Sequence, residues 1–500
     1  MVSLVATLAS PRDWPASALL LAATLVISLL VRLLRRPGLP SGASFTEWGV
    51  PFIGSLNFFT KRGDFLREGT KRSPNGYFNF YYGSYPIVAL SGEKARSAYF
   101  NTRGLDLSAG FRKLFSAGPD IDHMLGRNMG AYFIVLFKKL TGKEHLATCL
   151  PYLNKDARDA FSAIDTSVPM DPFVVLYDLL YKFTHRTVGC HDVAEDPMLQ
   201  EKTMRLYEKL DKTAAIQVMF PWLPTPTKLN KLWAGAKLHM LFGDIIRERR
   251  KSGRKAEDVM QYLMDKGESD LLSSAFIIGA LFAGLINTGV QSAWILCYLA
   301  YDPVWYAKVR AEVDAAVEKY RTSDDQTPVD VLAGLSLEAW ESEFPCIDFG
   351  VRDSIRLNLM GASIRQNTSG KDIVLGDTGV VVPNQAFAVY HVSDIHMDEA
   401  IYKNPLKWDP GRYFPERGED KKRQHGYIGW GTGLHPCCKQ TLIAKLELFV
   451  STATFFAMFD FKAVDKNGNP ATGPLPSYDS NALAAKRMID TVYFKCDRRF

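Results

Sequence analysis

The sequence is poor in cysteine and carries no large excess of charge of either sign. Its seven cysteines are an odd number and are scattered along 500 residues. This excludes the dense, paired spacing of a secreted disulfide scaffold and favours a reducing, cytosol-facing compartment. The formal net charge of +6 is too small to indicate a nucleic-acid partner. Apolar side chains, in contrast, make up 47% of the residues, which is enough for the core of a single large domain.

The N-terminus lacks the features of a cleaved secretory signal, because no positive cluster precedes its apolar run and no small-residue cleavage site follows it. Residues 16–34 form an apolar run broken only by Arg32, close to the roughly 20 residues that cross a bilayer. Further arginines follow directly, so the positive-inside bias places the rest of the chain in the cytosol. We therefore predict a membrane anchor at 1–36, a stiff proline-containing hinge at 37–45 and a catalytic body at 46–500.

The body is predicted to be mainly α-helical with small β-sheets. Apolar spacing at the helical period predicts helices over 131–140, 171–188, 197–215, 228–250 and 270–303. Two short strands are predicted within 77–90, two more lie across 364–383, and the glycine-punctuated stretch 104–130 is predicted to be irregular.

A glycine-rich loop near the C-terminus is the most informative stretch. It reads Tyr427-Ile-Gly-Trp-Gly-Thr-Gly-Leu-His-Pro-Cys-Cys-Lys-Gln440 and leads into an apolar helix. Its glycines permit backbone conformations that a Cβ forbids, and a cysteine just ahead of a helix is stabilised as the thiolate. Such a thiolate, with Trp430 beside it, suits the ligation of a flat metal macrocycle.

Two other readings of this loop stay open on the residues alone. Its cysteines can be small hydrophobes of a buried loop. A zinc site can also be drawn from His425, His435, Cys437 and Cys438, but adjacent cysteines do not give the Cys-x2-4-Cys spacing of structural zinc sites. His391 and His396 have no third ligand at a suitable spacing, so we expect them to be structural.

The loop resembles the haem-binding signature of the cytochromes P-450. Trp430, Gly431, Gly433, His435 and Cys437 stand in order where the family has its aromatic, glycine, glycine, basic and cysteine positions. The resemblance makes Cys437 the axial ligand of haem b, with Trp430 and Gly433 as cofactor contacts. The sequence departs from the family pattern at Lys439, where the family usually has a small residue close to the porphyrin, and at Cys438, where an apolar residue is usual.

The apolar stretch 270–303 resembles the long central helix of the family, which crosses the haem on its oxygen side. Ala283 and Gly284 match the family pattern Ala-Gly-x-acid-Thr, whereas Ile286 replaces the acid and Asn287 the threonine, with Thr288 one place late. The resemblance therefore implies haem contacts at Ala283 and Gly284 and catalytic positions at Asn287 and Thr288. Three glycines in this helix cost about 1 kcal/mol each relative to alanine, so a close approach is expected there.

A charged network is implied by two further matches. Asp353 and Arg356 are neighbours on one helix face and stand where the family has Glu-x-x-Arg, and Arg412 resembles the second arginine of that network. A carboxylate held by two guanidiniums would lock the chain behind the haem loop. By position, Arg365 and His435 resemble the residues that pair with the haem propionates.

Taken along the whole chain, the resemblance implies a eukaryotic microsomal cytochrome P-450, similar to fungal members allied to sterol 14α-demethylases. It implies a triangular helical prism around haem, and a monooxygenase that inserts oxygen from O2 into an apolar small molecule, such as a terpenoid, sterol, alkaloid or polyketide, in fungal secondary metabolism. The implied partners are NADPH–cytochrome P-450 reductase, cytochrome b5 as an additional electron donor, and the endoplasmic reticulum membrane. Asn287 leaves open a haem-thiolate isomerase or dehydratase that needs no reductase. Lys439 and Cys438 leave open a haem-poor pseudoenzyme.

Overall fold

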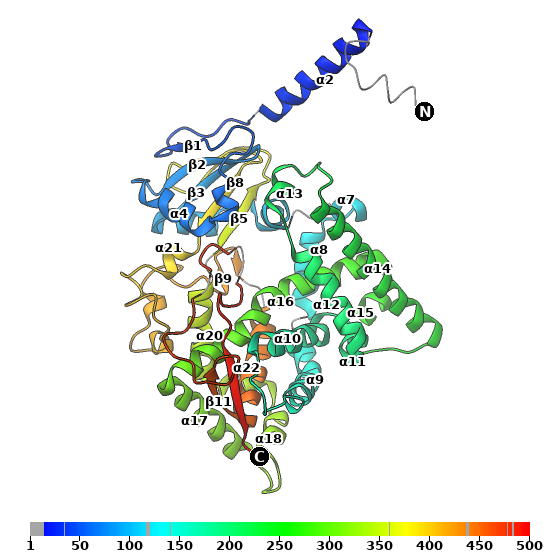
Figure 1. Ribbon diagram of the computed structural model, residues 1–500, viewed down its shortest axis with the longest axis vertical. Helices are drawn as coiled ribbons and strands as arrows, with labels where there is room; N and C mark the ends of the chain where they lie inside the picture. Colours follow the sequence, from blue (N-terminus) through cyan, green and yellow to red (C-terminus); the bar gives the residue numbers. More distant parts are fainter. Residues whose placement is uncertain are drawn as a thin grey trace.

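The computed structural model describes residues 15–34, 36–116, 121–140, 142–359, 361–436, 440–477, 479–482 and 485–500. Its α-helices are α2 (Ala16–Leu34), α3 (Asn57–Thr60), α4 (Arg62–Lys71), α5 (Glu93–Asn101), α6 (Leu107–Phe111), α7 (Ile121–Leu125), α8 (Met129–Leu140), α9 (Lys143–Ser162), α10 (Pro172–Val188), α11 (His191–Glu195), α12 (Pro197–Asp211), α13 (Ala215–Met219), α14 (Pro226–Ser252), α15 (Val259–Asp265), α16 (Asp270–Tyr301), α17 (Pro303–Tyr320), α18 (Pro328–Ala333), α19 (Leu337–Ser342), α20 (Pro345–Asn358), α21 (Ser393–His396) and α22 (Gln440–Met458). Short π and 3-10 turns are η2 (Arg112–Ser116), η3 (Pro410–Tyr413) and η4 (Glu419–Lys421). Helices therefore dominate the body, as predicted (Figure 1).

Several long helices begin at the same local signal, an Asp or Thr followed by proline. The Asp171, Asp196 and Thr225 side chains each accept a backbone N–H of the first turn, and proline stands at the first helical position. This position suits proline because its missing N–H has no partner in a first turn anyway. The signal explains why α14 starts at Pro226, two residues before the predicted start. Helix α12 ends at Asp211, before the predicted end at residue 215, and a separate helix α13 follows it.

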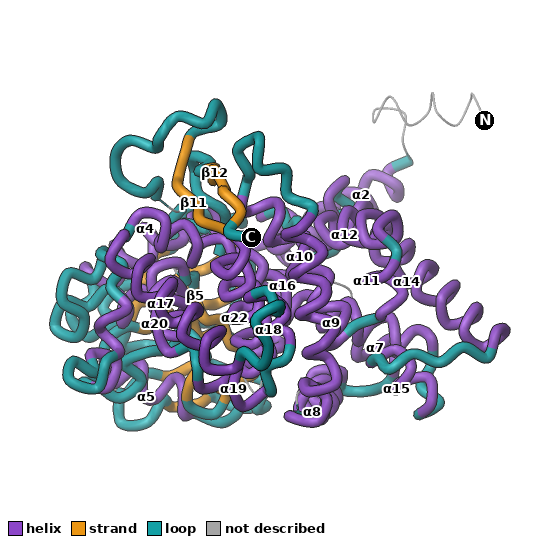
Figure 2. Tube along the Cα trace, turned by 90° about the horizontal axis from the view of Figure 1, so that it is seen from below, coloured by secondary structure: helices purple, strands orange, loops and turns teal. Residues whose placement is uncertain are grey.

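The strands make one larger sheet and three hairpin-sized ones. They are β1 (Thr46–Glu47), β2 (Tyr77–Tyr82), β3 (Tyr85–Leu90), β4 (Leu105–Asp106), β5 (Ala362–Asn367), β6 (Ile373–Val374), β7 (Val381–Val382), β8 (Phe387–His391), β9 (Gly431–Thr432), β10 (His435–Pro436), β11 (Phe459–Val464) and β12 (Tyr493–Arg498). The six-stranded sheet has the order β1-β2-β3-β8-β5-β4, in which β3 pairs parallel to β8 and β2 antiparallel to β3. Figure 2 shows the β11–β12 hairpin at the edge of the helical body, beside the C-terminus.

The N-terminal helix α2 projects away from this body (Figure 1), and most of its described side chains are exposed. The segment after it is fastened to the sheet rather than free. The Tyr81 hydroxyl donates to the Pro37 carbonyl at 2.6 Å, and Asn79 Nδ2 donates to the Pro40 carbonyl at 2.9 Å. The predicted hinge is thus held against β2.

The main core surrounds α16, a 32-residue helix that is half buried over its most apolar window. By length and composition α16 could also span a membrane, but its buried side chains pack against other helices of the body, including Trp294 and Leu296 at 0% exposure. A helix that is apolar nearly all round is expected in a core of this size.

Candidate active site

The glycines of α16 let neighbouring side chains approach its backbone closely. A Cβ at Gly284 would lie 3.1 Å from Thr184 Cγ2 on α10, and one at Gly289 would lie 3.0 Å from the Tyr177 ring. A Cβ at Gly279 would lie 3.2 Å from the Phe133 ring on α8. These contacts confirm the close approach that the three glycines predicted.

A cavity opens where α16 faces α22. Its atom-free space is about 740 Å³, including the part open to solvent. Its wall from α16 contains Ala283, Gly284, Asn287 and Thr288, so the structure brings all four predicted residues of this helix to one site. Ala283 and Asn287, one turn apart, are exposed within an otherwise largely buried helix, because they face this hollow. Trp430 also lines the cavity.

The loop below the cavity has the backbone that its glycines predicted. Gly431 and Gly433 have φ values of +68° and +65°, which an L side chain rarely adopts. Strands β9 and β10 pair as a minute hairpin across Gly433 and Leu434. A Cβ at Gly433 would lie 2.4 Å from the Phe100 carbonyl oxygen, so no larger residue fits there without movement.

Cys437 lies outside the described residues, as do Cys438 and Lys439. The described ends of the chain on either side are β10, which finishes at Pro436, and α22, which starts at Gln440. The predicted ligand therefore belongs to the short connection between the hairpin and a helix whose side chains Ile443, Ala444 and Leu448 line the cavity. This position suits a thiolate at a helix N-terminus, and the assignment of Cys437 stays a prediction.

Arg365 has a buried guanidinium with an unused donor, as expected of a residue that binds an anionic cofactor. Its side chain is 1% exposed, NH1 donates to the Tyr99 carbonyl at 2.7 Å, and the buried Nε has no hydrogen-bond partner. Among the described residues it has no carboxylate partner, and burial lowers its pKa. The guanidinium lies over the rings of Tyr99 and Phe100, and Phe100 contacts Gly433.

A buried guanidinium with an unused donor beside the loop fits a carboxylate-bearing group such as a haem propionate. The indole Nε1 of Trp430 is likewise buried without a partner. His435 lies in β10, and its side chain is outside the described part. The residues present therefore fit haem, and the individual roles of Arg365 and His435 remain predictions.

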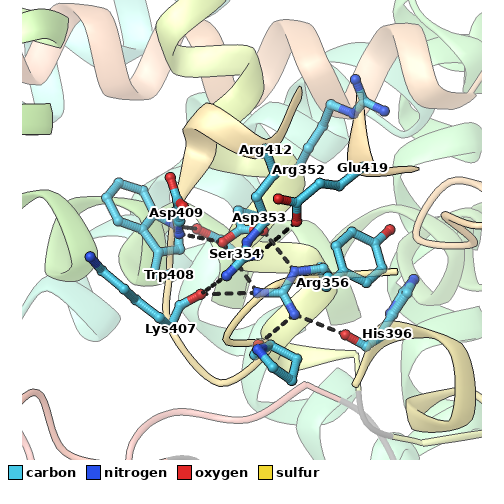
Figure 3. Close-up of polar contacts among 12 residues, drawn as sticks. Arg352, Asp353, Ser354, Arg356, His396, Lys407, Trp408, Asp409, Arg412 and Glu419 are labelled. Carbon is cyan, nitrogen blue, oxygen red and sulfur yellow. Dashed lines mark hydrogen bonds and ion pairs between the residues drawn. The ribbon is translucent and has the colours of Figure 1, made fainter. Parts of the chain in front are cut away.

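The predicted charged network is formed and completely buried (Figure 3). Arg356 Nε donates to Asp353 Oδ1 at 2.7 Å and NH2 donates to Oδ2 at 3.3 Å. Arg412 Nε lies 3.7 Å from Asp353 Oδ1, and its NH1 donates to Glu419 at 2.8 Å. The shorter acid, Asp353 in place of the family's glutamate, thus still reaches both guanidiniums.

The network is tied to the loop through His396. Arg356 NH1 donates to the His396 carbonyl at 2.9 Å, and the Ile428 amide donates to His396 Nε2 at 3.1 Å. Burial, with the nearby Arg356 charge, lowers the pKa of His396 to about 3, so the ring is neutral and free to accept. The structural role expected for His396 agrees with these contacts.

Sequence reasoning missed several residues of the site. Glu419 completes the charged network, and Glu447 on α22 lines the cavity together with Thr184, Thr187 and Gln291. Glu447 carried one available signal, since a single acid within an apolar helix has to be buried or paired. The sequence gives no signal that Thr184 and Thr187 belong to the site, because their helix α10 has the pattern of an ordinary amphipathic helix.

Comparison with known proteins agrees with this site. The family model of cytochrome P-450 matches residues 47–476. The chain is 32% identical to cytochrome P-450 monooxygenase AacuE of Aspergillus aculeatus, covering 86% of this chain and 88% of that protein. It is 30% identical to cytochrome P-450 monooxygenase nsrP of Aspergillus novofumigatus, with 90% of each covered. It is 24% identical to obtusifoliol 14-alpha demethylase of Triticum aestivum, covering 87% of this chain and 94% of that one.

Among solved structures, the retinoic acid-bound cyanobacterial CYP120A1 shares the fold. Its TM-score is 0.67 at 17% sequence identity, with 91% of this chain and 98% of that chain covered. The family and the fold imply haem held by an axial cysteine thiolate, which agrees with the cavity, the glycine loop and the unpaired Arg365 donor. The chain belongs to the cytochrome P-450 family and is a haem-thiolate monooxygenase.

Proposed function

We propose that the chain oxidises an apolar small molecule, of terpenoid, sterol, alkaloid or polyketide type, in fungal secondary metabolism. The observation that carries the proposal is the mainly apolar lining of the cavity between α16 and α22, which would receive the haem together with the substrate held against it. Such a lining is typical of sites for small apolar ligands. The similarity to two Aspergillus monooxygenases supports the fungal setting.

In the proposed mechanism the residues below the cavity hold the cofactor and those above it handle the substrate. Cys437 would ligate the haem, Trp430 and Gly433 would contact it, and Arg365 and His435 would pair with its carboxylates. The bound haem thiolate supplies the activation of dioxygen, since the thiolate favours O–O cleavage. Ala283 and Gly284 leave room for the flat group because neither has a long side chain.

Asn287 and Thr288 are proposed as the polar residues of the oxygen side. Asn287 faces the cavity and Thr288 is buried in its wall. Both can donate and accept hydrogen bonds, but neither holds a titratable proton at neutral pH. They therefore orient water or the oxygen substrate, while an acid elsewhere has to hold any proton reserve.

The electrons are proposed to come from NADPH through cytochrome P-450 reductase, with cytochrome b5 as an additional donor. We expect product formation from a terpenoid or polyketide test panel to require NADPH, reductase and O2 together, with one atom of labelled O2 in the product. Omission of NADPH or reductase should reduce turnover to the level without enzyme.

A second candidate, a haem-thiolate isomerase or dehydratase, is favoured by Asn287 at the oxygen side of the cavity. The same assay separates it from the first. Turnover of a peroxide or hydroperoxide substrate without NADPH, and without incorporation of label from O2, is the result that this second candidate predicts.

Residues 1–36 are proposed as a single-pass anchor in the endoplasmic reticulum membrane, followed by the segment 37–45 and the catalytic body at 46–500. The exposed leucines of α2 support it, including Leu20 at 71% and Leu25 at 62%, because such an apolar helix is poorly suited to water. In fractionated yeast, the full chain should sediment with microsomes and resist carbonate extraction. A chain lacking 1–36 should bind haem equally well yet shift largely to the soluble or carbonate-extractable fraction. Equal resistance of both chains would contradict an anchor at 1–36.

A further inference from the structure

Glu447 is the ionisable side chain among the described residues that line the haem cavity; the other lining residues are apolar or uncharged. Its side chain is 1% exposed and projects from α22, between Ala444 and Leu448 of the cavity wall. Among the described residues no cation pairs with it. A carboxylate that is buried without a cation is strongly disfavoured relative to the neutral acid.

Thr187 offers an ionised Glu447 only limited hydrogen bonding. Thr187 Oγ1 lies 3.1 Å from Glu447 Oε1, 3.0 Å from the Phe183 carbonyl oxygen and 3.4 Å from the Thr184 carbonyl oxygen. A threonine hydroxyl has one hydrogen, and in a helix it commonly donates to the carbonyl four residues earlier. The single hydroxyl hydrogen is therefore shared with two backbone carbonyls, so Thr187 stabilises an ionised Glu447 only in part.

Other charged groups near α22 already have hydrogen-bond or ion-pair partners. On α9, His145 contacts the Thr187 carbonyl and the Cys149 thiol, and burial together with Glu447 raises the pKa of Cys149 to about 12, so the thiol is neutral. On α10, Arg186 is bonded to Asp156 and Glu195, and residues 283–291 of α16 include no ionisable side chain. Four ion pairs lie along α22, joining Asp348 to Lys445, Glu341 to Lys143, Arg310 to Asp460 and Asp330 to Arg158. Glu312 on α17 accepts the Cys346 and Ile347 amides, and burial raises its pKa to about 7.

We propose that Glu447 is a proton-holding, positioning residue that couples reduction of the haem to uptake of one proton. Reduction of a bound haem by the proposed electron donor would add negative charge to the cavity and make an ionised Glu447 less favourable. A solvent proton then binds the Glu447 carboxylate, so that one electron and one proton enter together and the charge of the cavity is unchanged. At lower pH the proton is already in place and the electron enters alone.

The pH range follows from the carboxyl group. Burial raises the pKa of Glu447 to about 8 in the folded protein, while the hydrogen bond from Thr187 opposes that rise. Reduction raises this pKa further, so proton uptake accompanies reduction only above the pKa of the oxidised protein. The haem potential should be level below about pH 7 and fall above about pH 8, by up to about 59 mV per unit for a one-electron couple.

The test is spectroelectrochemical titration of purified holoprotein between about pH 6 and pH 9.5, comparing wild type with Glu447→Gln. Glutamine keeps the shape of glutamate but cannot ionise, so the fall of the haem potential with pH that is due to Glu447 should disappear. The difference in potential between wild type and variant should begin near pH 8. The haem carboxylates and titrating groups elsewhere in the protein are common to both proteins, so their contributions cancel in the difference. In parallel, the infrared spectrum of wild type at pH 6.5 should contain the C=O band of protonated Glu447. That contribution should be absent from the spectrum of Glu447→Gln.

Two threonine variants keep the test decisive if Glu447→Gln binds haem poorly. Thr187→Val removes the hydroxyl that donates to Glu447 and lowers its pKa. The fall of the haem potential should therefore begin at higher pH in this variant. Thr184→Val lies in the same cavity wall, without a hydrogen bond to Glu447, and should leave the onset unchanged. Identical potential curves for wild type and Glu447→Gln, or for wild type and Thr187→Val, would overturn the proposal.

Discussion

Replacing Arg356 with alanine is expected to abolish stable folding of the haem-binding body. The substitution leaves the buried Asp353 carboxylate with the Asp409 amide and the Tyr413 hydroxyl as donors, and with Arg412 as its remaining cation at 3.7 Å. It also removes the donors to the carbonyls of His396, Pro405 and Lys407. Removing one partner of a buried ion pair typically costs about 3–5 kcal/mol, which is a large share of the stability of most domains.

The measurement is haem content and the melting temperature of Arg356→Ala, followed by circular dichroism. Arg352→Ala is the matched control on the same helix. Arg352 pairs with Asp420 at 2.6 Å, and the two side chains are 20% and 9% exposed. Arg352→Ala removes one ion pair where Arg356→Ala also removes three hydrogen bonds to backbone carbonyls, so a smaller loss of stability is expected. Equal melting temperatures and equal haem content for Arg356→Ala and wild type would contradict a structural role for the network.

Replacing Cys437 with serine is expected to remove the thiolate ligand, whereas Cys438→Ser should leave it in place. The two cysteines are adjacent, so the two variants alter the same connection between β10 and α22 and differ in which sulfur is lost. Without the thiolate the haem is held by a weaker ligand and cannot promote O–O cleavage in the same way. We expect Cys437→Ser to lose most of its haem, to lose the low-spin thiolate signal in electron paramagnetic resonance, and to show no measurable turnover.

Cys438→Ser should retain the haem, the signal and turnover within a few-fold of wild type. The reverse pattern, with Cys438→Ser losing the thiolate signal and Cys437→Ser keeping it, would move the ligand to the neighbouring residue. It would also mean that the loop enters α22 one residue later than the family resemblance implies.

The comparison of sequence with structure separates two kinds of information. Periodic and local signals predicted α10, α16 and the positive φ angles of Gly431 and Gly433 well, because a helix period or a missing Cβ acts within a few residues. The same signals placed the start of α14 only approximately, since capping by Thr225 decides that boundary. They also missed the break between α12 and α13.

The candidate site was predicted as far as the motifs reached. Ala283, Gly284, Asn287, Thr288 and Trp430 all line the cavity, and the Asp353–Arg356–Arg412 cluster is buried as expected. Glu419 and the Thr187–Glu447 contact could not be predicted, because they depend on how distant segments pack. The charge state and pairing of these residues depend on burial in the folded protein, which a local sequence pattern does not determine.

The central claim is that a cysteine thiolate holds haem beneath the cavity between α16 and α22. The most direct test is the absorption difference spectrum of the purified, dithionite-reduced wild-type protein with and without carbon monoxide. We expect the red-shifted Soret band from which the family takes its name, in an amount equal to the haem determined chemically. A band at the shorter wavelength of imidazole- or water-ligated haem, or protein that stays colourless after haem is supplied during expression, would contradict it.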